Sequence, residues 1–172
     1  MNEALEAIYN RRSIRKYEDR QISRAELDAV LKAGTCAPTG MNRQSPIIIA
    51  LQNREDISGL SRLNAAVNGL SGDPFYGAPT VLIVLAEASS PHAVQDGSLV
   101  MGNMMNAASA LGLGSCWINR AKEVFDSPEG KAFLKKWNIQ GEYIGIGNCI
   151  LGYPAESPRM KPRKENYVYY VG

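Results

Sequence analysis

Hydrophobic residues run continuously through two segments of the chain, whereas a third segment repeats them at helical spacing. The runs IIIAL at 47–51 and TVLIVLAE at 80–87 lack the alternation of a half-exposed strand, so they predict strands that are covered on both faces. Segment 90–111 begins with a Ser-Pro pair and places hydrophobic residues every three or four positions, which predicts a long central helix. Its methionines, including Met101 and Met104, are predicted to fill the core.

Shorter patterns complete the expected order of elements. Segment 23–34 begins with a capping box formed by Ser23 and Glu26 and stops at Gly34, which predicts a helix with well-defined ends. The other expected elements are helices at 3–10 and 54–69, one or two helices at 121–137, and strands at 114–118 and 143–152. The tail YVYYVG at 167–172 favours β-structure but has no local partner, so it is expected to pair with a distant segment or another subunit.

Length and composition describe one globular domain. The chain has 172 residues, with 45% hydrophobic and 21% charged residues, and it contains no repeat or linker. We therefore expect residues 1–172 to form a single α/β or α+β sandwich. The N-terminus lacks the hydrophobic region of a signal peptide and no hydrophobic run reaches the roughly 18 residues that span a bilayer, so we expect a cytoplasmic protein without membrane contacts.

The chain is poor in residues that perform chemistry with their own side chains. Cys36, Cys116 and Cys149 are odd in number and lack CxxC spacing, so they predict reduced core thiols and neither a disulfide framework nor a metal site. His92 is the single histidine, which disfavours a histidine-based catalytic triad. An enzyme with this sequence is expected to use a cofactor for the difficult chemistry.

Positive charge is concentrated in two hexapeptides, RRSIRK at 11–16 and RMKPRK at 159–164. Together they hold eight of the 19 Lys and Arg residues, so the remaining 11 basic residues face 17 Asp and Glu residues. In an extended segment Arg11, Ser13 and Arg15 would point the same way, and the tail offers the same spacing. Such a set suits a phosphate dianion. Solvated cations at a helix end are the simpler alternative, and the acidic remainder of the chain argues against nucleic acid.

Two further stretches have both a structural and a functional interpretation. The loop CAPTGMNRQSP at 36–46 connects a helix to a strand, but its small residues could also let Thr39, Asn42 and Gln44 approach a flat ligand. The sequence GIGNCI at 145–150 has the glycine spacing of a dinucleotide-binding turn. Because it lies inside a predicted strand, its glycines more simply indicate a close approach of neighbouring backbones.

Five motifs together resemble the FMN-dependent nitroreductase family, in order along nearly the whole chain. They are RRSIRKYEDRQIS, AGTCAPTGMNRQSP, DPFYGAPTVLIV, NAASALGLGSCWI and LGYPAESPRMKPRK. The resemblance implies an α+β sandwich in which helices flank a mostly antiparallel central sheet. It also implies an intertwined homodimer with FMN at the interface, and a C-terminal tail, at about 153–172, that packs on the partner subunit.

The resemblance also implies roles for individual residues. The FMN phosphate and ribityl end would be held by Arg11, Arg12, Ser13, Arg15, Lys161 and Arg163. The partner's loop would contact the ring system through Pro38, Thr39, Gly40 and Asn42, with Gln44 as a further candidate. Asn64 would meet the pyrimidine edge, and the backbone of Trp117, Ile118 and Asn119 would lie beside the flavin.

The activity implied by the resemblance is FMN-dependent oxidation of NAD(P)H with a small-molecule acceptor such as a nitroaromatic or a quinone, by a ping-pong mechanism. No side chain is needed as a catalytic acid or base, because a flavin performs the hydride transfer. Other flavin reactions on this scaffold, such as dehalogenation or dehydrogenation, and a non-enzymatic flavin sensor remain alternatives. The chain departs from many relatives at Asn119 and Arg120, where an acidic residue and a glycine are common.

Overall fold

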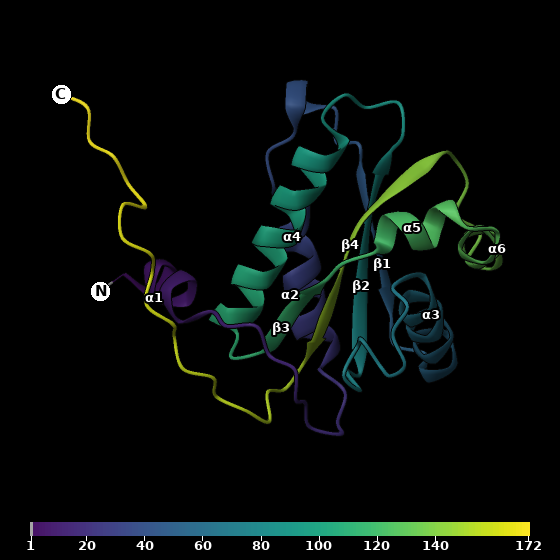
Figure 1. Cartoon of the computed structure of the whole chain (residues 1–172), viewed down its shortest axis with the longest axis horizontal. Helices are drawn as coiled ribbons and strands as arrows, with labels where there is room; N and C mark the ends of the chain where they lie inside the picture. Colours follow the sequence, from purple (N-terminus) through teal and green to yellow (C-terminus); the bar gives the residue numbers. More distant parts are fainter. Residues whose placement is uncertain (1) are drawn as a thin grey trace.

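The centre of the molecule is a four-stranded antiparallel sheet. The computed structural model describes residues 2–172 and orders the strands β1-β2-β4-β3 (Figure 1). The strands are β1 (Pro46–Leu51), β2 (Thr80–Glu87), β3 (Gly114–Ile118) and β4 (Tyr143–Gly152). All three pairings are antiparallel, which confirms the expected α+β sandwich with an antiparallel sheet.

Helices cover both faces of the sheet and enclose two hydrophobic cores. One core lies under α3 (Arg54–Val67), α5 (Ala121–Asp126) and α6 (Pro128–Lys136). The other lies under α2 (Arg24–Thr35) and α4 (Ala93–Ala110). Strand β2 contributes to both, because Ile83 and Leu85 belong to the first core and Leu82 and Val84 to the second. The prediction that this strand is covered on both faces is therefore confirmed. The same prediction is wrong for the edge strand β1, where Ala50 is exposed and Ile47 and Ile48 are only half-buried.

The long helix α4 differs from the prediction at its ends. It starts at Ala93 and not at the Ser-Pro pair, because Ser90 accepts the turn hydrogen bond of Ala93 before the helix begins. Met101 and Met104 are fully buried, which confirms them as core residues. Val94 is exposed, in contrast, although Ala93 and Asp96 in the same turn are buried. The region 121–137 forms two helices, and Ser127 caps the second.

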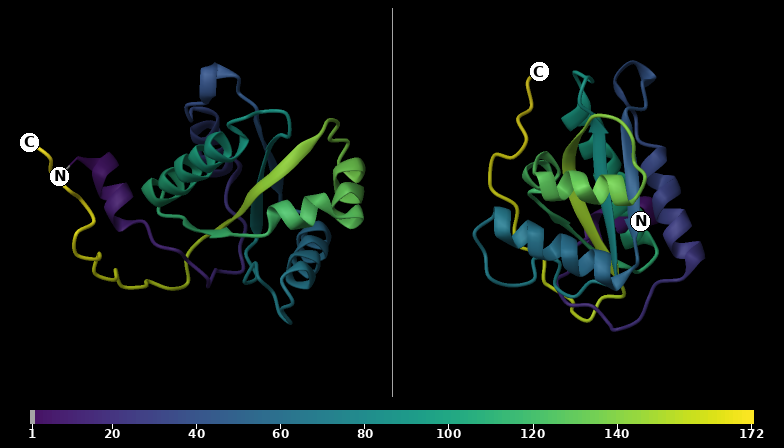
Figure 2. Two further views of the ribbon diagram at one scale, coloured as in Figure 1. Left: turned by 45° about the horizontal axis from the view of Figure 1, so that its top comes forward. Right: turned by 90° about the vertical axis from the view of Figure 1, so that its right-hand side faces the viewer.

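The two ends of the chain leave the sheet together. Helix α1 (Glu3–Asn10) lies beside the last turn of α4, where Ser109 Oγ donates to the Ala7 carbonyl at 2.8 Å. The segment after α1 runs antiparallel to the tail, with hydrogen bonds from Glu18 to Tyr153 and from Ala155 to Lys16. Residues 157–172 then extend away from the domain and are exposed (Figure 2). Residues 167–172 form no strand within residues 2–172, so their expected pairing with another subunit stays a prediction.

Candidate functional site

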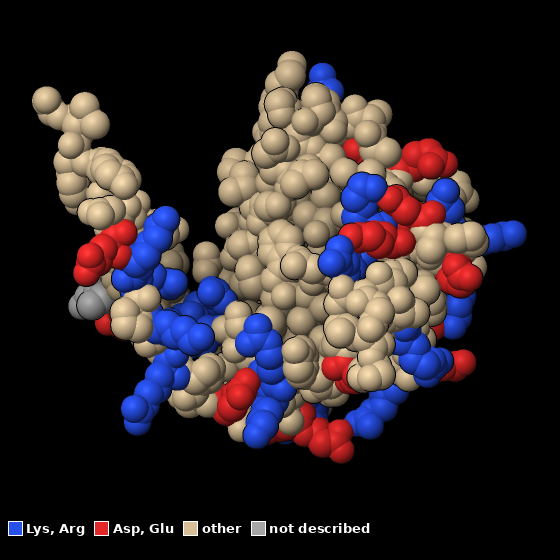
Figure 3. Space-filling model, in the orientation of Figure 1, with Lys and Arg blue, Asp and Glu red and all other residues tan. Residues whose placement is uncertain are grey.

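The two basic hexapeptides meet at one cavity, called here the basic cavity. It has a volume of about 300 Å³. Its lining consists of Arg11, Arg12, Ser13, Arg15, Pro158, Arg159, Met160, Lys161 and Arg163. The lining contains six basic side chains and no acidic one. Figure 3 shows this concentration of Lys and Arg at the lower left, where the N-terminal segment and the tail lie together.

The N-terminal side of the basic cavity is fixed by strand β3. Ser13 forms a parallel bridge with Ser115, and the Ile14 N–H donates to the Ser115 carbonyl at 3.0 Å. Arg12 is held by its own Nη1, which donates to the carbonyls of Tyr9 at 2.7 Å and Arg11 at 2.8 Å. The hydroxyl and guanidinium groups are therefore placed by backbone contacts, and together they provide the donors that bind a phosphate dianion.

A second and larger hollow, called here the central pocket, lies next to the basic cavity, because Arg15 lines both. It has a volume of about 570 Å³. Its lining consists of Arg15, Asn64, Asn68, Leu70, Pro74, Tyr76, Trp117, Ile118, Asn119, Arg120, Lys122, Glu123 and Ile146. A space of this size is within the usual range for a small-molecule site.

The floor of the central pocket is the end of β3 and the loop that follows it. Asn64, which is buried on α3, donates from Nδ2 to the carbonyl of Asn119 at 2.9 Å and so holds this loop against the helix. Trp117 packs its indole on Gly147, where a Cβ would lie 2.7 Å from the ring. The Trp117 Nε1–H is buried and has no hydrogen-bond acceptor within the described chain. The backbone of Trp117 to Asn119 is therefore held in one position beside the pocket.

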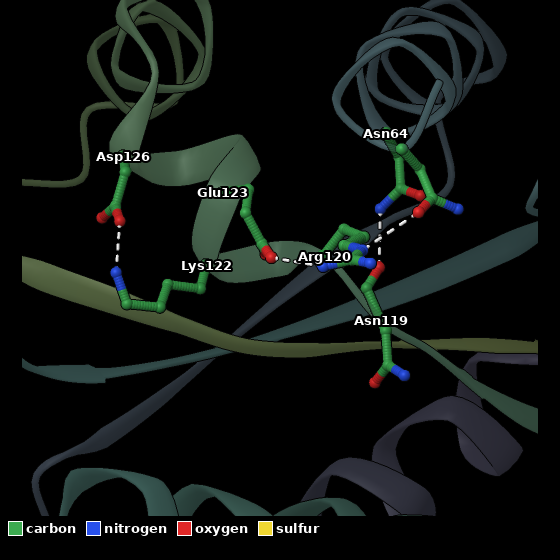
Figure 4. A network of polar contacts seen from close by, with 7 residues as sticks. Asn64, Asn119, Arg120, Lys122, Glu123 and Asp126 are labelled. Atoms are coloured by element: carbon green, nitrogen blue, oxygen red, sulfur yellow. Dashed lines mark hydrogen bonds and ion pairs between the residues drawn. The ribbon is translucent and has the colours of Figure 1, made fainter. Parts of the chain in front are cut away.

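The rim of the central pocket carries a network of charged residues that the sequence did not assign (Figure 4). Arg120 donates from Nε to Asn68 Oδ1 at 3.0 Å and from Nη1 to Glu123 Oε1 at 2.7 Å. The hydrogen bond from Arg120 lowers the pKa of Glu123, and the hydrogen bond to Asp126 raises the pKa of Lys122. The departure from the family pattern at Arg120 was the only sequence signal for this network.

The residues expected from the 38–44 loop lie elsewhere. They are Pro38, Thr39, Gly40, Asn42 and Gln44, and they surround the short helix η1 (Gly40–Asn42). The Gly40 N–H donates to Asp96 Oδ1 at 2.9 Å, and a Cβ on Gly40 would lie 2.4 Å from the His92 ring. The loop is thus anchored at the first turn of α4.

The loop and the basic cavity are at opposite ends of α4, because α1, which leads into RRSIRK, contacts the last turn of that helix. At 1.5 Å per residue, the 18 residues of α4 separate the two by about 27 Å. One chain therefore does not bring the loop to the basic cavity, and no residue of the loop lines either hollow.

The loop itself is unusual in its backbone. Met41, Asn42 and Gln44 all have positive φ values, between 53° and 54°. Thr39 Oγ1 accepts a hydrogen bond from the Gln44 N–H at 3.1 Å, and Gln44 Nε2 donates to Asn42 Oδ1 at 3.3 Å. Residues without glycine's freedom rarely adopt this conformation, and such strain concentrates at functional sites.

Other kinds of site are not found in the part of the chain that the structure describes. Residues 2–172 contain no group of three or more His, Cys, Asp or Glu side chains placed to hold a metal ion. None of their helices has the length and hydrophobicity that a membrane crossing requires.

Comparison with known proteins places this chain in a family. The model of the nitroreductase family matches residues 8–156, so the chain belongs to the nitroreductase family. A nitroreductase of Bacteroides fragilis, solved with bound FMN, is 32% identical and superimposes with a TM-score of 0.87 over 100% of both chains. A Desulfitobacterium hafniense nitroreductase, 24% identical, shares the fold with a TM-score of 0.91 over 100% of both chains.

A curated relative from Methanothermobacter thermautotrophicus bears the provisional name NADH dehydrogenase/NAD(P)H nitroreductase. It is 32% identical over 160 residues, which cover 91% of this chain and 80% of the relative.

Proposed function

We propose that this chain is an FMN-dependent NAD(P)H oxidoreductase of the cytoplasm that reduces nitroaromatics, quinones or similar small-molecule acceptors. The observation that carries the proposal is that Arg15 lines both hollows, so the two lie next to each other. The basic cavity offers cationic forks and a hydroxyl for a phosphate, and the central pocket beside it has room for a flat ring. The donor set therefore fits FMN, whose phosphate and ring system are the two ends of one molecule.

The chain's own residues would bind FMN and orient it. Arg11, Arg12, Ser13 and Arg15, with the tail residues Lys161 and Arg163, would hold the phosphate and ribityl end. When bound, FMN supplies the hydride-transfer chemistry, so the protein needs no catalytic acid or base. Asn64 keeps the loop at Asn119 in place and faces the central pocket, where it would meet the ring's polar edge.

A second copy of the chain would complete the site. The loop of Pro38, Thr39, Gly40, Asn42 and Gln44 is too far from its own basic cavity, so we infer that it serves the partner's site in an intertwined homodimer. Exposed hydrophobic side chains support this inference, because a monomer gains nothing from leaving them in water. They include Leu5, Ile8 and Tyr9 on α1, Val94 and Leu99 on α4, and Tyr167, Val168, Tyr169 and Tyr170 in the tail.

Donor and acceptor would use the central pocket in turn. This pocket opens beside the backbone of Trp117 to Asn119, so we expect NAD(P)H to leave before the acceptor enters. This arrangement predicts ping-pong kinetics.

The proposal is tested on purified protein by spectroscopy, light scattering and kinetics. We expect a flavin absorbance spectrum, a dimer in dilute solution, and NAD(P)H oxidation that gives parallel lines in double-reciprocal plots against a quinone. Protein stripped of flavin should lose activity and regain it with FMN. A stable flavin-loaded monomer would refute the shared site, and intersecting lines would refute the alternating use of the pocket.

A further inference from the structure

Arg120 occupies a backbone conformation that favours glycine. Its φ is 77° and its ψ is 10°, in the left-handed region, and it directly precedes α5 without a side-chain cap. A residue other than Gly, Asn or Asp costs roughly 1 kcal/mol there. A glycine would avoid this cost, so the arginine side chain must contribute something that glycine could not. Its position on the rim of the central pocket shows where that contribution is made.

The charges around the central pocket are unbalanced. Arg15, Arg120 and Lys122 line it, against Glu123 as the single acidic residue of the lining. Asp126, which pairs with Lys122 at 2.5 Å, lies outside the lining. With Asp126 counted, three positive charges on and beside the wall face two negative ones, and this excess of positive charge favours anions.

The Arg120 guanidinium is held in place and still has donors to offer. Asn68 on α3 and Glu123 on α5 hold it from two sides. These hydrogen bonds use two of its five N–H groups, as far as residues 2–172 are concerned. The side chains of Arg120 and Glu123 are 47% and 45% exposed, so the ion pair between them is weak and a ligand carboxylate can share or replace it.

We propose that Arg120 determines substrate specificity by binding an anionic oxygen group, a carboxylate or a phosphate, on a reactant in the central pocket. This inference rests on the proposed function, because that function brings reactants to this pocket. The anionic group can come from the acceptor, as the carboxylate of an acidic nitroaromatic, or from the donor, as the extra phosphate that distinguishes NADPH from NADH. Lys122 adds to the attraction from the same side.

The test compares reactants that differ by one anionic group. The variant is Arg120→Asn, because asparagine tolerates the left-handed conformation and is neutral. The control is Arg24→Asn, which removes the same charge from an exposed i,i+4 ion pair on α2, away from both hollows. The reactant pairs are 4-nitrobenzoate with 4-nitrobenzamide and NADPH with NADH, at one fixed salt concentration. Calorimetry of the two nitro compounds on FMN-loaded protein, without a donor, measures binding apart from turnover.

We expect Arg120→Asn to reduce preference for the charged member of a pair by about tenfold, because a hydrogen bond to a charged group is worth roughly 1.5 kcal/mol or more. If kcat/KM and affinity both fall for nitrobenzoate relative to nitrobenzamide, the acceptor is the source of the anion. A fall in the NADPH to NADH ratio identifies the donor. Arg24→Asn should change neither ratio.

Unchanged ratios in Arg120→Asn would overturn the proposal, as would equal losses for charged and neutral members. If the proposed function is wrong, wild-type protein will oxidise neither NADH nor NADPH. The ratio of the affinities for nitrobenzoate and nitrobenzamide would still decide the role of Arg120. Should the Asn variant fold poorly, Arg120→Gly removes the same charge and also relieves the backbone.

Discussion

Gly145 on β4 lies directly against the carbonyl of Ala121, the first residue of α5. A Cβ built on Gly145 would be 2.2 Å from both the carbon and the oxygen of that carbonyl. No side chain can fit there, so the backbone of α5 is seated on the sheet itself. This contact fixes where α5 begins, and therefore where the preceding Asn119 and Arg120 face the central pocket.

We predict that Gly145→Ala strongly destabilises the protein. The added methyl group meets backbone and not a flexible side chain, so β4 and α5 must separate at a cost of at least about 1–3 kcal/mol. For a domain of this size that lowers the Tm by roughly 2–4 °C per kcal/mol, which thermal unfolding measures. Gly59→Ala is the matched control, because its nearest neighbour is the tip of a side chain, the Phe133 ring at 3.0 Å, and not backbone. An equal loss in both variants would contradict the backbone contact.

We predict that Arg163→Ala weakens FMN binding by about 10- to 100-fold and leaves riboflavin binding nearly unchanged. Riboflavin has the same ring and ribityl chain but no phosphate, and a hydrogen bond to a charged group contributes roughly 1.5–3 kcal/mol. Titration of both ligands at one salt concentration measures the difference. Equal weakening of both ligands would mean that Arg163 supports the fold or the dimer.

We predict that Asp56→Asn loosens the contact between α3 and α6. Asp56 accepts hydrogen bonds from Lys136 Nζ at 2.5 Å and from Trp137 Nε1 at 3.0 Å, and these two bonds, Lys136 first, lower its pKa. The stabilisation is therefore present above the unfolded pKa of about 4 and is lost as the pH falls through the lower folded pKa. The variant should melt about 2–4 °C lower at pH 7 and approach wild type at strongly acidic pH. A difference independent of pH would exclude the charge as its cause.

We predict that Cys36 reacts with a thiol reagent in the native protein, whereas Cys116 and Cys149 react only after unfolding. Cys36 is exposed, so the expectation that all three are core thiols is wrong for this residue, whereas the other two are buried. Burial, followed by the neighbouring Cys116, raises the pKa of Cys149 to about 12. Because the unfolded thiol ionises near pH 8.5, this site's contribution to stability is present below that pH and declines as the pH rises toward 12. Denaturant titrations at pH 8 and pH 10, on wild type and Cys149→Ala, measure the decline.

Much of the architecture could be predicted from local patterns, because burial on both faces leaves a continuous hydrophobic run in β2 and a capping box marks the start of α2. The expected close approach of backbones at the β4 glycines is confirmed for Gly145, against Ala121, whereas Gly147 makes room for the Trp117 side chain. Strand order is a different matter, since periodicity says nothing of which strands are neighbours. The left-handed backbone of Arg120 was equally out of reach, because an arginine gives no local signal for that conformation.

The position of the 38–44 loop, at the far end of α4 from the basic cavity, has a genetic consequence. In a twofold-symmetric dimer each site would take its loop from one chain and its basic cavity from the other. A chain altered only in the loop and a chain altered only in the basic cavity would then complement each other. Their mixed dimers would hold one site with both defects and one with none. With random pairing about half of the dimers are mixed, so co-expression of two inactive chains would restore roughly a quarter of the wild-type sites.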